Sequence, residues 1–259
     1  MSTTRSIRLA AAVLAAAFAA WLVTVQRMDG MNGGPGTDLG ALGWYVGVWV
    51  TMMAAMMLPA VLPVVLLFAR MSSERLRRGQ AAVETPVFLA GYFAVWTAFG
   101  LVAYAIARTI SDRHLAFLGW DRGGRYVAAG AIGLAAAYQL TPLKRVCLRH
   151  CRSPLALILA HWREGRLGAV RMGVEHGGWC VGCCWGLMLA LFAVGVMSIA
   201  WMVIVSAAIF VEKVLPRGER LTFVLGALLL GLAVWIAADP GSVPWLVQPG
   251  GGDMGGMTM

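Results

Sequence analysis

The stretch HGGWCVGCCWGLMLALF, residues 176–192, places three cysteines within five positions and continues as an apolar run without a formal charge. Such a run is typical of a helix in a lipid bilayer, because spanning the hydrocarbon layer takes about 20 mostly apolar residues. The stretch therefore predicts a chain that enters a membrane beside a group of thiols.

The composition extends this prediction to the whole chain. Of the 259 residues, 60% are hydrophobic and only 13% are charged, whereas a soluble domain is about half apolar and about one quarter charged. The apolar residues are gathered into long uncharged runs. We therefore predict an all-α, polytopic helical membrane protein that is embedded in the lipid bilayer.

The apolar runs predict about seven transmembrane helices. Two of them lie between residues 178 and 211, with a split near residues 197–198; if that region were one tilted span, the count would be six. The segment 155–173 mixes apolar and basic residues, which predicts an amphipathic helix on the cytoplasmic surface. The other five predicted spans are residues 8–25, 43–69, 86–107, 126–140 and 221–238.

Residues 1–238 are thus expected to form one transmembrane domain, followed by a flexible tail at 239–259 that is rich in Gly and Met. The first apolar run begins like a signal peptide. It is somewhat longer than a typical signal core, which favours a retained helix.

The positive charges predict the orientation. With the N-terminus in the cytoplasm, most of the 21 Lys and Arg residues fall on the cytoplasmic side, as the positive-inside rule requires. We therefore expect a multi-pass protein of the bacterial inner membrane, with a periplasmic C-terminus. The same distribution explains the net charge of +9 without a nucleic-acid partner. The outer side would keep only Arg27, Arg108, Arg113, Arg122 and Arg125.

All five cysteines fall at the cytoplasmic face or just below it in this topology. Because the cytoplasm keeps thiols reduced, they are expected to be free thiols or metal ligands. On a helix, Cys180, Cys184 and Met188 form one line of sulfur atoms. The candidate ligands are therefore Cys147, Cys151, Cys180, Cys183, Cys184 and Met188.

Soft sulfur ligands favour Cu(I), with zinc as the alternative. Tetrahedral zinc needs about four ligands, whereas about two or three thiolates are enough for Cu(I). His150 and His176 lie close enough in the sequence to complete a site, and Lys144 with its basic neighbours could stabilise thiolates. The alternative is that the cysteines are small apolar packing residues.

A group of methionines lies in the second predicted helix, before two prolines that should kink it. These residues could relay a metal ion with Met188 near the middle of the bilayer, or they could be flexible core filler. Met28, Met31 and three methionines of the tail could capture Cu(I) outside. The members of the helix group are Met52, Met53, Met56 and Met57.

Glu212 and Lys213 are adjacent charged residues at the inner end of a predicted span. They could pair with each other at the level of the lipid headgroups. A carboxylate this close to a bilayer can also be functional.

In combination, these motifs resemble a poorly characterised bacterial family of integral membrane proteins that are described as predicted metal-binding proteins. The resemblance is carried by "MMAAMMLPA", "YQLTPLKRVCLRHCRSP" and "GGWCVGCCWGLMLALFAVGVMS" followed by "EKVLP". It implies that the five cysteines and the Met52–Met57 group are the relevant positions.

The leading functional hypothesis is a Cu(I)-handling protein of the inner membrane, either a transporter or a membrane-embedded metallochaperone. The alternatives are a membrane thiol redox protein and a non-catalytic assembly partner, with another membrane protein or a second copy as the partner. No nucleotide-binding loop and no nucleophile–base arrangement stands out. The sequence therefore favours a function without catalysis but leaves the redox alternative open.

Overall fold

The computed structural model describes residues 3–28, 41–79, 84–112, 123–153, 165–195, 198–215 and 218–243. Almost all of them are helical, which confirms the all-α prediction. The helices are α1 (Thr3–Met28), α2 (Leu42–Arg77), α3 (Thr85–Asp112), α4 (Arg125–Leu140), α5 (Pro142–Arg152), α7 (Gly165–Val194), α8 (Ile199–Val214) and α9 (Gly218–Ala238), followed by the short 3₁₀ helix η3 (Pro240–Ser242).

The predicted count of seven spans differs from what is observed. Five helices, α1, α2, α3, α7 and α9, are long and apolar enough to cross a membrane. The pair α4–α5 meets the same criterion only together, and it bends by 67° at Thr141. The 16-residue α8 falls short of it because an α-helix rises only about 1.5 Å per residue.

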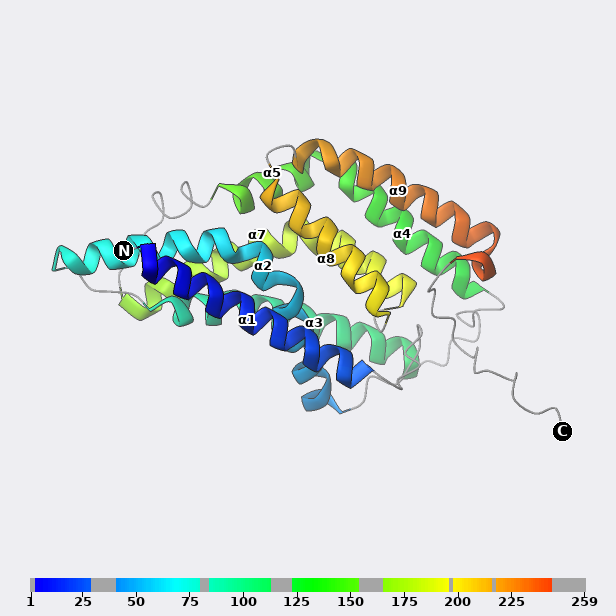
Figure 1. Cartoon of the computed structure of the whole chain (residues 1–259). Coiled ribbons are helices and arrows are strands. Elements are labelled where there is room, and N and C mark those ends of the chain that lie inside the picture. The colour runs from blue at the N-terminus through cyan, green and yellow to red at the C-terminus, as the bar shows by residue number, and fades with distance from the viewer. Residues whose placement is uncertain are drawn as a thin grey trace.

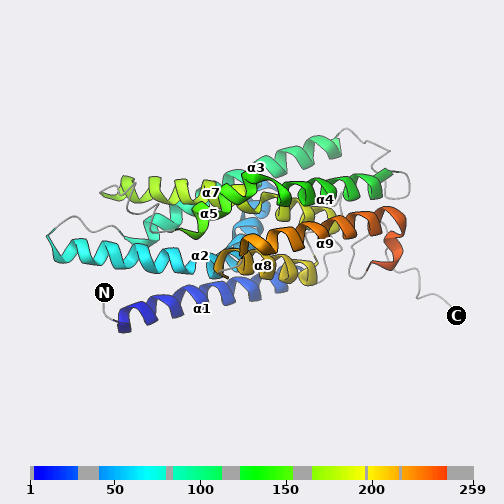
Figure 2. The ribbon, with the colours of Figure 1, turned by 90° about the horizontal axis from the view of Figure 1, so that it is seen from above.

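The helices lie side by side in an elongated molecule (Figure 1). α1 begins near one end and α9 finishes at the other, and the view from above shows the same arrangement (Figure 2). The most extensive pairings are α3 with α7, α4 with α9 and α1 with α2. Of these pairs, only α1 and α2 are consecutive in the chain, whereas the other two join helices that are separated in the sequence.

The helix α7 corrects two predictions. It begins at Gly165 rather than near Gly178, so residues 165–173 of the predicted surface helix are its first turns. The rest of that prediction falls outside the described residues. Cys180 therefore lies about 22 Å along α7. The three thiols are in the middle of a long helix, not at its entrance.

The early start of α7 has a packing cause. A side chain at Gly173 would collide with the backbone carbonyl oxygen of Phe88, and one at Gly177 would press on α3 as well. Because these glycines have no side chains, α3 and α7 can pack closely together. This packing stabilises the first helical turns of α7, which hydropathy alone would place on the surface. At the other end, Gly195 with φ of 113° stops the helix, as the predicted split requires.

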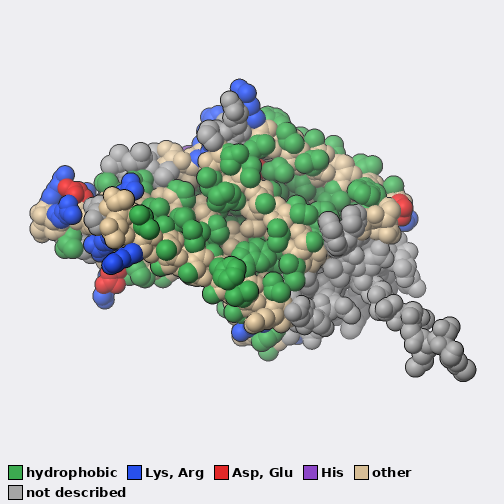
Figure 3. All heavy atoms as spheres, viewed as in Figure 1, with side chains coloured by type: hydrophobic (Ala, Val, Ile, Leu, Met, Phe, Trp, Pro, Cys, Tyr) green, Lys and Arg blue, Asp and Glu red, His purple; other side chains and the backbone are tan. Residues whose placement is uncertain are grey.

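The face seen in Figure 3 is mostly hydrophobic, and charged side chains gather towards the narrow end that includes the C-terminus of α2. Large apolar side chains such as Phe18, Val102, Leu134 and Val234 are exposed. Exposed apolar surface of this extent marks contact with lipid or with another protein.

Candidate metal centre

A row of thiols lies where α5 packs against α7. The Sγ atom of Cys183 is 3.5 Å from Sγ of Cys151 and 3.4 Å from Sγ of Cys184. With Cys180, these cysteines are at most 5% exposed. We call Cys151, Cys180, Cys183 and Cys184 the thiol row. The structure thus joins the two cysteine motifs that the sequence presents separately.

The local sequence of α5 explains how Cys151 reaches this position. Thr141 caps the helix by accepting the backbone N–H of Lys144 at 3.2 Å, and Pro142 occupies the first turn. Four residues then share one buried face at helical spacing, namely Lys144, Cys147, Leu148 and Cys151. α5 is thereby clamped with its thiols towards α7.

Cys147 is buried one turn before Cys151, against Gly182. A Cβ atom added at Gly182 would lie only 2.9 Å from Sγ of Cys147. The glycine therefore makes room for this thiol beside the α7 backbone. Cys147 flanks the thiol row and serves as a natural reference for it.

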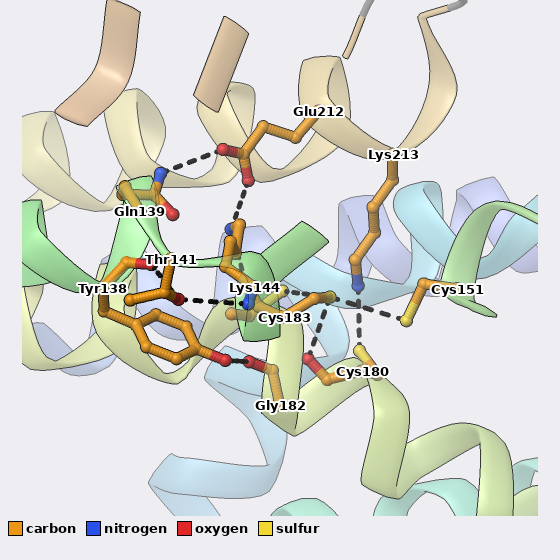
Figure 4. A network of polar contacts seen from close by, with 11 residues as sticks. Tyr138, Gln139, Thr141, Lys144, Cys151, Cys180, Gly182, Cys183, Glu212 and Lys213 are labelled. Atoms are coloured by element: carbon orange, nitrogen blue, oxygen red, sulfur yellow. Dashed lines mark hydrogen bonds and ion pairs between the residues drawn. The ribbon is translucent and has the colours of Figure 1, made fainter. Parts of the chain in front are cut away.

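Cys180 is held by groups from two other helices. Nζ of Lys213, on α8, donates a hydrogen bond to Sγ of Cys180 at 2.8 Å, and the hydroxyl of Tyr92, on α3, lies 3.0 Å from the same sulfur. Figure 4 shows Lys213 reaching from α8 towards Cys180. An ammonium at this distance favours the thiolate, the form that binds metals.

A second buried polar group adjoins the thiol row. Nζ of Lys144 donates to Oε2 of Glu212 at 2.7 Å and to the backbone carbonyl of Cys183. Nε2 of Gln139 donates to Oε1 of Glu212 at 2.9 Å. The ion pair ties α5 to α8 beside the cluster (Figure 4).

The expected pairing of Glu212 with Lys213 is wrong. Adjacent residues of a helix point about 100° apart, so Glu212 faces α4 and α5 while Lys213 faces α7. Lys144 lies beside the thiols as expected, but its ammonium is paired with Glu212. A Lys and a Glu among apolar residues indicate in the sequence that each needs a charged partner. The sequence does not indicate which residue that partner is.

The two predicted histidines have different positions. His176 is 3% exposed, its ring lies 5.9 Å from that of Tyr92, and its Nδ1 has no hydrogen-bond partner among the described residues. His150 is exposed, stacks on Trp179 at 4.1 Å and bonds the Val146 carbonyl through Nδ1. The structure therefore brings only His176 into the buried surroundings of the thiol row.

The methionines predicted for the helix interior are buried in the same core as the thiols, whereas Met28, Met31 and the tail methionines lie outside the side chains that the structure describes. Met52, Met53, Met56, Met57 and Met188 are each at most 2% exposed. Side-chain contacts join α2 to α7, since Trp49 stacks on Phe192 with ring centroids 5.7 Å apart. Their role as metal ligands stays a prediction, because core packing gives the same burial.

The donor set of the thiol row suits a soft ion with few ligands. Among the described residues, no three Cys, His, Asp or Glu side chains already surround a single metal position. The thiols form an open row, whereas a tetrahedral zinc site uses about four converging ligands. Buried thiols beside a cation that stabilises the thiolate can bind a soft ion such as Cu(I) or Zn(II).

Comparison with protein-family models gives a match over most of the chain. A family model described as "PpoB2: Copper chaperone" matches residues 46–236, a range that holds all five cysteines and the methionines of α2. No curated protein and no solved structure matches the chain.

Proposed function

The chain belongs to the PpoB2 family of copper chaperones, and from this premise we propose that it is a membrane-embedded metallochaperone that carries Cu(I) on the thiol row. Copper is the cargo in this proposal. The observation that supports it most directly is the contact of Cys183 with both Cys151 and Cys184 at 3.4–3.5 Å. A small shift of these soft donors would let two or three of them bind one Cu(I) ion.

We further propose that the protein spans the bacterial inner membrane with its N-terminus in the cytoplasm. Five apolar helices of sufficient length and the exposed apolar face support this placement. Basic residues follow the expected bias, with Arg70, Arg75 and Arg77 at the end of α2 that would face the cytoplasm. Thiols in the middle of α7 would then lie below the headgroups.

Buried methionines supply a further step in the proposal. Thioethers on α2 and Met188 on α7 offer weaker sites through which Cu(I) could leave the thiolates. Transport across the membrane would extend such a relay to both faces. We favour the chaperone over the transporter because of the family match.

A test of the proposal is the copper content of the full chain, purified in mild detergent under anaerobic, reducing conditions and loaded with Cu(I). We expect about one copper per chain, and its loss in Cys183→Ser and Cys151→Ser. The matched control is Cys147→Ser, which removes a buried thiol of the same helix outside the thiol row and should keep the copper.

The result contrary to the proposal is equal copper in all four proteins, or none in any. A second candidate, a thiol redox function, is favoured by the 3.5 Å separation of Cys151 and Cys183. It predicts a reversible Cys151–Cys183 disulfide, seen as a maleimide gel shift, in protein that holds no metal.

A further inference from the structure

Two lysines adjoin the thiol row, and they differ in how their charge is balanced. Lys144 is paired with Glu212 at 2.7 Å, and both side chains are at most 2% exposed. Lys213 is half-buried, and the contact of its Nζ is the sulfur of Cys180. Lys144 thus belongs to a neutral pair, whereas the charge of Lys213 is directed at the metal-binding thiols.

The charge of a bound ion decides whether Lys213 is balanced. Cu(I) held by two thiolates, of which Cys180 is one, carries one net negative charge, which the single ammonium of Lys213 neutralises. Zn(II) on the same two thiolates is already neutral and leaves the ammonium uncompensated. An uncompensated charge is costly in a buried site. It has lost its hydration, and the low dielectric does not screen its repulsion from the bound cation.

We propose that Lys213 is a specificity-determining residue that makes the thiol row prefer a monovalent soft cation to a divalent one. This inference rests on the proposed function, since it concerns the same site. It adds a cause for selectivity that lies outside the ligands themselves. The thiols alone would serve either Cu(I) or Zn(II), and the fixed neighbouring charge separates the two.

The arrangement of the helices supports a lasting role for this charge. Lys213 comes from α8, which is also fastened to α5 through Glu212. Its contact is Cys180 itself, so the ammonium adjoins the ion when Cys180 is one of the two ligands. The ammonium can therefore remain beside the site as its counter-ion after the metal has bound.

The test compares full-length wild type with Lys213→Gln and Lys213→Arg in detergent. Gln keeps a hydrogen-bond donor but loses the charge, and Arg keeps the charge. Cu(I) affinity is measured by competition with bicinchoninate, and Zn(II) affinity by competition with a zinc indicator. We expect Lys213→Gln to lower the ratio of Cu(I) to Zn(II) affinity by at least about tenfold.

Lys213→Arg should stay within about threefold of wild type, because its charge is retained. An unchanged ratio in Lys213→Gln overturns the inference, provided the variant elutes as a single species in size exclusion. The proposed function has a separate failure: wild type that binds no Cu(I), or binds it equally well after loss of Cys183. The two failures are thus distinguishable in one set of preparations.

Discussion

Lys144 and Glu212 make an ion pair that is closed off from water on the α5–α8 side of the thiol row. Lys144→Met would leave the carboxylate of Glu212 buried, with Gln139 as its one remaining hydrogen-bond donor among the described residues. Breaking one partner of a buried pair costs about 3–5 kcal/mol, so we expect the free energy of unfolding to fall by about that amount. Denaturant unfolding in detergent measures it.

A matched control uses the exposed pair of Arg166 and Glu84, with side chains 80% and 60% exposed. Glu84→Gln should change the free energy of unfolding by less than about 1 kcal/mol. The double variant Lys144→Met, Glu212→Leu should recover most of the loss, because no unpaired charge remains. A loss in Lys144→Met no larger than in Glu84→Gln would show that the pair contributes little.

At this scale, residue type and spacing singled out the cysteines and the methionines as candidates, and the structure buries them in one core. Their role as metal ligands stays a prediction. The partners of the charged residues could not be predicted from the sequence. Lys213 meets Cys180 across 33 positions, and Lys144 meets Glu212 across 68. Such contacts depend on how α8 crosses α5 and α7, which no local pattern encodes.

Among the helices, α3 and α7 approach most closely at Gly173. A Cβ atom there would overlap backbone atoms of α3 at Phe88 and Tyr92. We expect Gly173→Ala to force the helices apart and to lower the free energy of unfolding by about 1–3 kcal/mol. Because Tyr92 contacts Cys180, the same change should weaken Cu(I) binding.

Gly178→Ala is the control on the same helix, since an added Cβ there meets nothing within 4 Å. Alanine favours a helix over glycine by about 1 kcal/mol, so this variant should be neutral or slightly more stable. Thermal unfolding in detergent compares the two. Equal midpoints for both would contradict the close approach of α3 and α7.

The contact of α5 with α7 can be trapped covalently. In a chain that retains only Cys151 and Cys183, whose sulfur atoms are 3.5 Å apart, a mild oxidant should form a disulfide. The product is detected in the denatured protein, as two thiols that are protected from a maleimide reagent until a reductant is added. A chain retaining Cys151 alone should stay reactive, and failure to protect the pair would place α5 elsewhere.

The observed helix boundaries show where hydropathy fails to predict the start or end of a helix. The end of α9 at Ala238 was predicted to the residue because its apolar sequence ends there, whereas the helix begins at Gly218 instead of residue 221. The start of α7 was predicted too late because the charges of Arg166, Arg171 and Glu175 are typical of a surface segment. Packing against α3 makes these residues part of the long helix. The bend after α4 follows from Pro142, and a hydropathy pattern does not predict such a bend.

For the molecule as a whole, the orientation in the membrane is open to a direct test. In a background without cysteines, Glu74→Cys and Thr109→Cys place single exposed thiols near opposite ends of the helices. We expect a membrane-impermeant maleimide to label Thr109→Cys on intact spheroplasts and Glu74→Cys only after lysis. Labelling of both, or the reverse, would contradict the proposed topology.

The all-α class followed from the sequence because long uncharged apolar runs of this length favour helices. The arrangement of those helices did not follow. Apolar side chains are as compatible with lipid as with one another, so hydropathy does not choose neighbours. The pairing of α4 with α9, far apart in the chain, is fixed by fit at positions such as Gly226 against Leu140.

The burial of the thiol row also limits how quickly anything can reach it. With Cys180, Cys183 and Cys184 at most 1% exposed, a reagent, an oxidant or a donor of copper meets them only when neighbouring helices part. The rate at which these thiols are alkylated therefore measures how often the helices part, just as amide hydrogen exchange measures local unfolding. A membrane that slows the parting of helices would slow cargo exchange and oxidative damage in the same proportion.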